Sequence, residues 1–459
     1  MTHDVAHYQG LVDTAMAPHR WILCGDVAAV FTPVVDHLRE IGAPRPLLLA
    51  GSEGTGNQPD PEAAEVIVLG TSSDTMLGGI RAYHAALRSL PQSAIDSIEA
   101  WDPDRTARVL ASFLDTELDI AGRPSWGARP LSWLALEDKL RAESIWEAAG
   151  VAHAGHVNVA AVASDLVEAA RSMDRGDGTV WAGDDREGWN GGAEYGRIVV
   201  DPDNAHDAID FFTAHCDRVR VMPFLTGVPC SIHGMVFPDT VTAFRPVEMI
   251  VFRSPGSDRF RYSSVATTWD PTVEVRAEMR VAAQRVGAHL REAHDFRGAF
   301  TMDGVATVDG WLPTELNPRF GAGLGSVGRS SGMPLLGISR LLIEGQTGGL
   351  DPVEVETIAV EASDRIRQLG GLAMITVPAT GTHEQRVEYS HGRMIPVAEG
   401  GHGMLELGPS PMGGLVRLAM DPGSVPAGTF GAPVAQAGFA LADELWDTGI
   451  GPLIPATPA

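Results

Sequence analysis

Hydrophobic and polar positions over the first 130 residues alternate between short apolar runs and longer amphipathic stretches. Three apolar runs, each closed by a glycine, have the length of strands: residues 21–24, 46–50 and 66–69. Three stretches have the spacing of helices: residues 30–41, 75–90 and 104–114. Strands that alternate with helices form a parallel sheet with helices on its faces, so this part is predicted to be Rossmann-like.

The pattern changes after residue 131. A helix is predicted over residues 132–149, ended by Gly150. Between residues 180 and 268, short apolar runs broken by Gly, Pro and Asp indicate antiparallel sheet. A long amphipathic helix at 273–293 then precedes two more strands, at 297–302 and 311–316.

The last 110 residues contain a further β-rich segment and a terminal helix. The strands are predicted near residues 371–377, 404–407 and 416–419, and the helix near 435–446. The whole chain is therefore predicted to be mixed α/β, with a small β-rich region at its C-terminal end.

Composition excludes several classes of function. The 459 residues include 34 basic and 59 acidic side chains, a net charge of −25, which does not suit binding to nucleic acid or to an anionic membrane. Cys24, Cys216 and Cys230 have no paired spacing, which argues against disulfides or a zinc cluster. The N-terminus lacks signal-peptide features and no apolar run approaches 18 residues, so a soluble, cytoplasmic protein is predicted.

The clearest set of chemical groups lies on the predicted strand pair between residues 298 and 319. Asp303 lies near the end of the first strand, and Glu315 and Asn317 are two residues apart on the second, so they share a face. Three oxygen donors on a rigid sheet suit Mg²⁺, and Arg319 continues the alternation and could bind a phosphoryl group. From spacing alone, a hairpin with a solvated polar face is an equally good interpretation.

These residues resemble a known family. Asp303 followed after twelve residues by Glu315-x-Asn317-Pro318-Arg319 resembles the metal- and nucleotide-binding strand pair of the ATP-grasp superfamily. Residues 137–140, Glu-Asp-Lys-Leu, followed by Ala-Gly-Val at 149–151, resemble the segment that opens its ATP-binding region. In relatives the lysine of this segment contacts the nucleotide phosphates, and here it is Lys139, the only lysine of the chain.

Other segments follow in the order of that superfamily. The glycine-rich residues 183–196 resemble the flap that closes over the phosphates, and residues 221–225 resemble the hinge whose backbone pairs with adenine. Arg245 and Glu248 resemble residues of a strand that faces the triphosphate. The alternatives are that residues 183–196 form a hairpin loop, that residues 221–225 belong to the hydrophobic core, and that Arg245 and Glu248 form a surface ion pair.

One segment departs from the family pattern. Relatives carry a second lysine on the strand before the flap, but residues 179–182 read Thr-Val-Trp-Ala. Arg186 could supply the missing charge from the loop; otherwise the nucleotide pocket is altered.

Two glycine motifs are misleading. Residues 323–328 match G-x-G-x-x-G and residues 328–332 match G-x-S-x-G, but neither follows an apolar strand. A nicotinamide site and a nucleophile elbow are therefore not predicted. A glycine loop that binds the carboxylate substrate is the preferred interpretation, and His153 and His156 are interpreted as ordinary residues.

The resemblance implies an ATP-grasp fold: a Rossmann-like preATP-grasp domain (1–131), a two-lobed ATP-grasp domain (132–345, hinge near 221–227) and a C-terminal β-rich region (346–459). It implies an ATP- and Mg²⁺-dependent carboxylate–amine ligase, like peptide ligases of natural-product pathways. Such an enzyme joins a small amino acid-like carboxylate to an amine through an acyl phosphate and releases ADP and phosphate. The implied metal ligands are Asp303, Glu315 and Asn317, and the implied catalytic residues are Arg319 and Arg245. The implied nucleotide-binding residues are Lys139, Arg186, Gly191, Gly192, Met222, Pro223, Phe224, Leu225 and Glu248.

Two alternatives remain. One is a nucleotide-binding protein with weak or no ligase activity, because the second lysine is absent. The other is a different ATP-grasp reaction, such as kinase or carboxylase chemistry, although no biotin-type partner segment is present. A homodimer is an expectation from the family alone, and the sequence does not identify the two substrates.

Overall fold

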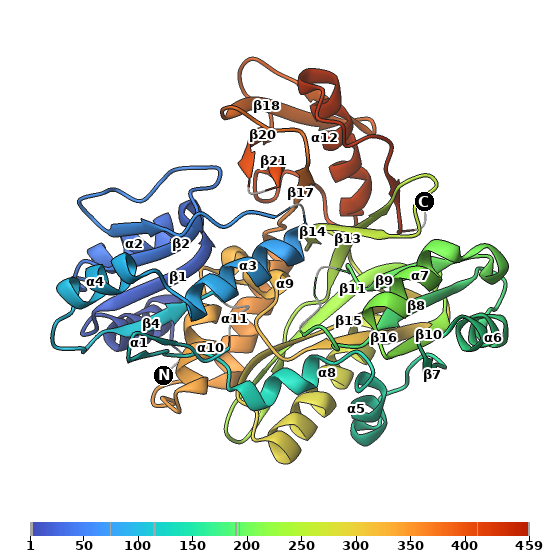
Figure 1. Cartoon of the computed structure of the whole chain (residues 1–459), viewed down its shortest axis with the longest axis horizontal. Coiled ribbons are helices and arrows are strands. Elements are labelled where there is room, and N and C mark those ends of the chain that lie inside the picture. Colours follow the sequence, from blue (N-terminus) through green and yellow to red (C-terminus); the bar gives the residue numbers. More distant parts are fainter. Residues whose placement is uncertain are drawn as a thin grey trace.

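The computed structural model describes residues 3–73, 75–112, 116–188, 191, 193–410 and 412–457, except for the side chain of Met76. Within these residues the chain forms four sheets of four or more strands. Figure 1 shows the N-terminal domain in blue, a green lobe on the opposite side, the C-terminal region in red above, and a long sheet between them. The predicted mixed α/β class, with a Rossmann-like N-terminal unit and a small β-rich C-terminal unit, is confirmed.

The N-terminal domain is a parallel sheet in the order β3-β2-β1-β4. Its strands are β1 (Trp21–Val27), β2 (Leu47–Ser52), β3 (Glu65–Val68) and β4 (Arg108–Ala111). Its helices are α1 (Val5–Met16), α2 (Thr32–Glu40), α3 (Met76–Arg88) and α4 (Gln92–Trp101), with a 3-10 turn at Ala28–Phe31. The helix predicted over 104–114 is wrong: this stretch contains β4, whose apolar residues are buried on both faces and therefore show no strand alternation.

The connection to the next domain contains the small strand pair β5 (Asp119–Ile120) and β6 (Arg123–Pro124). The single helix predicted over 132–149 is wrong in its first half. A 3-10 helix, Leu131–Glu137, is followed by a turn, and only α5 (Ala142–Ala149) is α-helical. The Asp138 carboxylate accepts a hydrogen bond from the Leu140 backbone N–H at 3.0 Å, a local turn that competes with the helix. The predicted end at Gly150 is confirmed, with a left-handed φ of 64°.

The green lobe of Figure 1 is an antiparallel sheet in the order β7-β10-β8-β9. It is called the ATP lobe below, after the sequence resemblance that implies an ATP-binding region here. Its strands are β7 (Val157–Ala160), β8 (Thr179–Gly183), β9 (Gly196–Val199) and β10 (Arg218–Pro223). Helices α6 (Ala163–Met173) and α7 (His206–His215) cover one face, with a 3-10 turn at Pro202–Asn204. Among the described residues, no helix of this lobe packs on the other face.

The central sheet has the order β14-β13-β11-β15-β16. These strands are β11 (Val228–Val236), β13 (Val247–Arg253), β14 (Phe260–Ala266), β15 (Gly298–Thr307) and β16 (Gly310–Asn317), with β12 (Val241–Ala243) and β22 (Ile454–Pro455) at its margins. Helix α8 (Val273–His294) packs on one face, and α9 (Ala322–Ser331), α10 (Leu335–Ile343) and α11 (Pro352–Arg365) lie toward the other. The predicted helix at 273–293 and the two strands that follow it are confirmed.

The C-terminal region is an antiparallel sheet in the order β17-β21-β20-β18-β19, covered by α12 (Gly431–Trp446). Its strands are β17 (Gly370–Ile375), β18 (His383–Ser390), β19 (Arg393–Pro396), β20 (Gly403–Ser410) and β21 (Gly413–Met420). Helix α11 packs on α9, and the hydrophobic core of the C-terminal sheet includes Leu369, just before β17. Among the described residues, no helix has the length and apolar character needed to cross a membrane.

Candidate active site

The predicted trio of oxygen donors lies together on one face of the central sheet. Strands β15 and β16 pair so that Asp303 is opposite Glu315 and Thr301 is opposite Asn317. The Asn317 Nδ2 donates to Asp303 Oδ2 at 2.8 Å, and the Ser231 hydroxyl on β11 donates to Asp303 Oδ1 at 2.5 Å. The period-2 argument from the sequence therefore placed these side chains correctly.

The chemistry of this donor set fits a divalent cation. Burial and, next, the charge of Glu315 raise the pKa of Asp303 to about 7. No hydrogen bond or ion pair of the Glu315 carboxylate is found within the described part of the chain. Two adjacent carboxylates, one without a partner, repel each other until a cation lies between them, and hard oxygen donors of this kind suit Mg²⁺.

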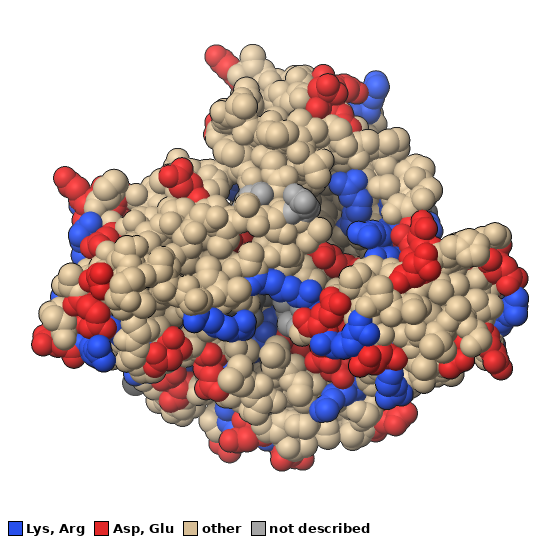
Figure 2. Space-filling model, in the orientation of Figure 1, with Lys and Arg blue, Asp and Glu red and all other residues tan. Residues whose placement is uncertain are grey.

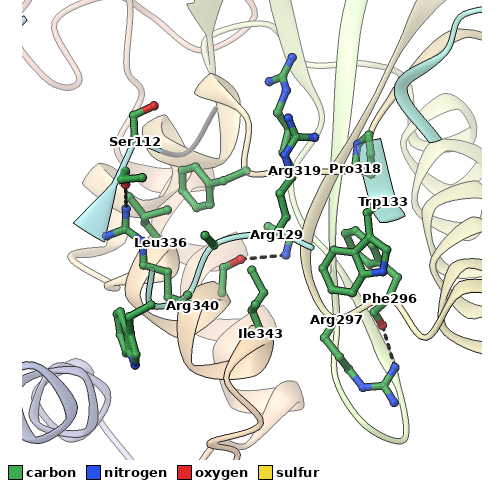
Figure 3. Close-up of a pocket in the computed structure, with 17 residues that line it drawn as sticks. Ser112, Arg129, Trp133, Phe296, Arg297, Pro318, Arg319, Leu336, Arg340 and Ile343 are labelled. Atoms are coloured by element: carbon green, nitrogen blue, oxygen red, sulfur yellow. Dashed lines mark hydrogen bonds between the residues drawn. The ribbon is translucent and has the colours of Figure 1, made fainter. Parts of the chain in front are cut away.

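Arg319 lies beside this cluster and is held by a buried carboxylate. Its Nε is 2.6 Å from Glu137 Oε1, and its Nη2 donates to Asn317 Oδ1 at 2.8 Å. Glu137 also accepts from Arg129 at 2.6 Å. A cavity of about 30 Å³ adjoins these groups, with Arg129, Arg319, Trp133 and two further arginines in its wall (Figure 3).

Lys139 is buried in the turn between the 3-10 helix and α5, with 7% of its surface exposed. Its ammonium group makes no hydrogen bond or ion pair within the described residues, whereas its backbone oxygen accepts from Arg220 at 3.0 Å. Arg220 also donates to the backbone oxygen of Thr314, next to Glu315, at 2.9 Å. One guanidinium group thus spans the distance between the Lys139 turn and the strand of Glu315.

The predicted hinge begins at the end of β10. Pairing of β10 with β7 stops at Val221, while pairing with β8 continues to Pro223. The Phe224 N–H then donates to the Gly178 oxygen at 2.9 Å, and the Arg253 guanidinium lies 5.6 Å from the Phe224 ring centre. Beyond Val221 the edge of β10 that faces β7 has no strand partner in the described chain, so Met222 and its successors to Leu225 offer one open backbone edge.

The flap is only partly described. Gly191 is buried, and Gly192 lies outside the described residues. The Arg186 guanidinium donates to the backbone oxygens of Ala214 and Cys216 and to Asp217, where it caps the C-terminal end of α7. The hydrogen bonds of Arg186 are therefore made at the end of α7 and not at the Asp303–Glu315–Asn317 cluster. On β8, Trp181 packs in the core under α6 and α7, so Val180 and Ala182 lie on the opposite face of the sheet. Strand β8 therefore has no lysine on that face.

Two predicted site residues have other partners. Arg245 is fully buried and pairs with Asp270 and Asp364, and it also donates to two backbone oxygens. Glu248 is equally buried and accepts from the backbone N–H groups of Gly431 and Ala432, at the start of α12. Both attach neighbouring elements to the central sheet, so we correct the sequence interpretation and remove them from the candidate site.

The structure adds three residues that the sequence interpretation did not assign a role: Ser231, Glu137 and Arg220. Ser231 could have been found from the pairing of β11 with β15, which a single sequence does not reveal. Glu137 belongs to the segment that resembles the family, but its two arginine partners are 8 residues before and 182 residues after it. Arg220 gives no local signal at all.

Figure 2 shows that basic side chains gather around the hollow at the centre of this face, between the N-terminal domain and the ATP lobe. Acidic side chains lie at the edge of the same hollow toward the ATP lobe and are numerous on the surrounding surface. In a chain of net charge −25, arginines concentrated in a hollow are suited to attract an anion.

No protein-family model and no curated protein matches this chain. Solved structures do match in fold. The L-amino acid ligase of Bacillus licheniformis has 14% identity and a TM-score of 0.51, and the match covers 96% of this chain and 100% of that one. Biotin carboxylase of Campylobacter jejuni has 12% identity and a TM-score of 0.54, with 89% of each chain covered. An N5-carboxyaminoimidazole synthase of Aspergillus clavatus, in complex with ADP and its ribonucleotide, has 11% identity and a TM-score of 0.51, with 93% and 99% covered.

These proteins are ATP-grasp ligases, and the matches cover between 89% and 96% of this chain. The chain therefore has the ATP-grasp fold, with an N-terminal preATP-grasp domain, as the sequence resemblance predicted.

Proposed function

We propose that this protein is an ATP-dependent carboxylate–amine ligase that acts through an acyl phosphate. The observation that carries the proposal is the cluster of Asp303, Glu315 and Asn317 next to Arg319. Oxygen donors that can bind a metal ion thus lie next to a guanidinium group that can bind a phosphate. Transfer of a phosphoryl group requires this arrangement.

Each residue has a role in this proposal. Asp303, Glu315 and Asn317 would hold Mg²⁺, which neutralises phosphate charge when it is bound. Lys139 is a buried residue whose ammonium group has no hydrogen-bond or ion-pair partner among the described residues, and this group would bind the phosphates. The open backbone edge from Met222 to Leu225 would bind adenine. Arg319, oriented by Glu137, would bind the transferred phosphoryl group.

The chemistry has two steps. The oxygen of a substrate carboxylate attacks the γ-phosphorus of ATP, the bond to the β-phosphate oxygen breaks, and ADP leaves. The amine then attacks the acyl carbon, phosphate leaves, and the amine loses a proton. The protein contributes position and charge compensation to both steps. The similar solved structures include an L-amino acid ligase and a synthase in complex with ADP, which supports the proposal.

The test begins with calorimetric titration of Mg·ATP, followed by phosphate-release assays with a panel of amino acids, bicarbonate and amines. Products are identified by mass spectrometry. We expect Glu315→Gln to abolish ADP release without unfolding the chain. Glu278→Gln is the matched control, because Glu278 accepts from the Trp311 N–H on the same strand pair but lies on α8. Turnover in Glu315→Gln at the wild-type rate would refute the ligase mechanism.

A second candidate rests on β8, where Val180 and Ala182 occupy the face opposite α6 and α7 and no lysine is present. In this case the protein binds nucleotide with little or no ligase activity. Binding of Mg·ATP without turnover over the whole panel would favour this candidate over the ligase.

A further inference from the structure

Arg220 lies on the face of the ATP-lobe sheet opposite α6 and α7. It pairs across the sheet with Ala182, while its strand neighbours Val219 and Val221 pack in the core under α6 and α7. Because side chains alternate along a strand, Arg220 points away from those helices, toward the rest of the site. Only 3% of its surface is exposed.

The Arg220 guanidinium group joins three other elements. It donates to the Lys139 oxygen at 3.0 Å, to Glu143 Oε1 on α5 at 2.8 Å, and to the Thr314 oxygen on β16 at 2.9 Å. Glu143 is itself buried, so the ion pair balances one positive charge with one negative charge. Arg220 therefore has no net charge left for a phosphate, and its contacts are those of a connector.

The two backbone oxygens that accept from Arg220 belong to the segments that carry the proposed phosphate-binding lysine and the proposed metal ligands. One belongs to Lys139. The other belongs to Thr314, the extra residue of a β-bulge: Asp303 is opposite Glu315, but Gly304 is opposite Pro313. The Thr314 hydroxyl donates to the backbone carbonyl oxygen of Asp303 at 3.3 Å. Displacement of Thr314 would therefore move Glu315 relative to Asp303.

We propose that Arg220 is a positioning residue that fixes the Lys139 turn and the Asp303–Glu315 pair at one separation, so that both act on the same nucleotide. This inference rests on the proposed function. The planar guanidinium can donate to several acceptors in fixed directions, whereas a lysine in its place supplies the charge but not the fixed geometry.

The test is a double-mutant cycle measured as the Kd of Mg·ATP by calorimetry. We expect Arg220→Lys to weaken binding about tenfold, the effect of one or two charge-assisted hydrogen bonds. In the Lys139→Met background we expect the same substitution to have an effect of less than about twofold, because Arg220 acts through Lys139. A purely structural role would give equal losses in both backgrounds.

Arg123→Lys is the matched control. Arg123 is also fully buried and bonds to Asp102 and Glu99, but it lies in the N-terminal domain, so Mg·ATP binding should not change. If circular dichroism shows that Arg220→Lys does not fold, Glu143→Gln replaces it in the cycle, with an expected loss of about threefold.

Three results would overturn the inference. The first is a folded Arg220→Lys variant that binds Mg·ATP like the wild type. The second is an equal loss with and without Lys139. The third, absence of Mg·ATP binding by the wild type, refutes the proposed function and this inference with it, and is recognised before any variant is made.

Discussion

At the scale of single residues, the charges near the candidate site occur in groups. Glu137 is shared by Arg129 and Arg319, and Arg319 also donates to Asn317. Burial alone would raise the pKa of Glu137, but Arg319 and Arg129 outweigh this effect and hold it below its ordinary value. The carboxylate stays charged, so the direction of Arg319 is set by a residue that touches neither metal nor substrate in our proposal.

The first prediction concerns Glu137→Gln. Loss of a buried charge that two guanidinium groups share should cost about 3 kcal/mol of unfolding free energy. Because Arg319 loses its orienting partner, turnover should fall about 100-fold, while the Kd of Mg·ATP changes less than about threefold. The measurements are urea unfolding, calorimetry and ADP release. Glu99→Gln is the control, since Glu99 bonds to Arg105 and Arg123 in the N-terminal domain; equal loss of turnover in both variants would contradict the prediction.

The second prediction concerns pH and Glu248. Burial raises the pKa of Glu248 from 4.5 to about 7 against the opposite effects of Gly431, Ala432 and Thr457. The folded chain therefore binds this proton more tightly than the unfolded chain, and the stability that this provides is lost as the pH rises toward 7. From pH 5 to pH 7.5 the wild type should lose about 2 kcal/mol relative to Glu248→Gln, as measured by urea unfolding. Parallel pH profiles of the two proteins would refute this assignment.

The success of the sequence interpretation differed among residues for a physical reason. Asp303, Glu315 and Asn317 could be placed because a strand repeats every two residues and a turn of two residues brings the two strands together. Arg245 could not be placed, because its carboxylate partners are 25 and 119 residues away. Spacing gives information on local geometry, but the partner of a buried charge depends on tertiary structure.

At the scale of elements, the glycines of α9 explain a misleading motif. Gly323 and Gly328 match a dinucleotide fingerprint, yet they lie inside a helix that packs on the central sheet. A Cβ atom at Gly323 would lie 2.3 Å from His233 Cε1. The glycine is therefore required for close packing of helix and sheet, and His233, whose pKa burial lowers to about 3, stays neutral beneath it.

The third prediction compares two glycines of this helix. Gly323→Ala should push α9 from the sheet and lower the unfolding free energy by about 2 kcal/mol. Gly325→Ala is the control: its Cβ would meet only the Arg329 Nη1 and the Phe320 ring, both at 3.7 Å, and alanine favours helix, so stability should stay equal or rise by about 0.5 kcal/mol. Thermal unfolding measures both variants. Equal stability of the two variants would show that α9 is not in close contact with His233.

The helix predicted over 132–149 shows the limit of periodicity for elements. Apolar spacing continues through residues 131–149, but Asp138 bonds to the Leu140 N–H and the α-helix begins only at Ala142. That turn exposes the Lys139 oxygen to Arg220. Prediction from apolar periodicity fails here because the backbone of the candidate site is irregular. In a continuous helix, the Lys139 oxygen would accept a hydrogen bond within the helix and could not accept from Arg220.

At the scale of the whole molecule, the domains share their cores. One cluster combines Trp21 and Leu23 of the N-terminal sheet with Leu324 and Val327 of α9. Another contains Leu77, from α3 of the N-terminal domain, within the core of the ATP lobe. Periodicity predicted a parallel α/β part, an antiparallel part and a β-rich part in this order. It did not predict their contacts, because interdomain packing leaves no periodic signal in either partner.

The contact of α3 with the ATP lobe leads to the last prediction. The Leu77 N–H, at the start of α3, donates to Glu194 Oε1 at 2.9 Å, and the Arg81 guanidinium lies 5.8 Å from the Tyr195 ring centre. These contacts hold the segment before β9 against the N-terminal domain. Leu77→Ala should remove about 2 kcal/mol from this contact, because it leaves a cavity in the lobe core.

The measurement is hydrogen exchange of the β9 amides. We expect exchange to become about 30-fold faster in Leu77→Ala without nucleotide, since 1.4 kcal/mol corresponds to about tenfold, and Mg·ATP should restore most of the protection. Leu87→Ala is the matched control, because Leu87 lies on the same helix but packs in the core of the N-terminal domain. If both variants left β9 equally protected, α3 would not hold the ATP lobe. If Leu87→Ala exposed β9 as much as Leu77→Ala, the effect would arise from general loosening of the N-terminal domain.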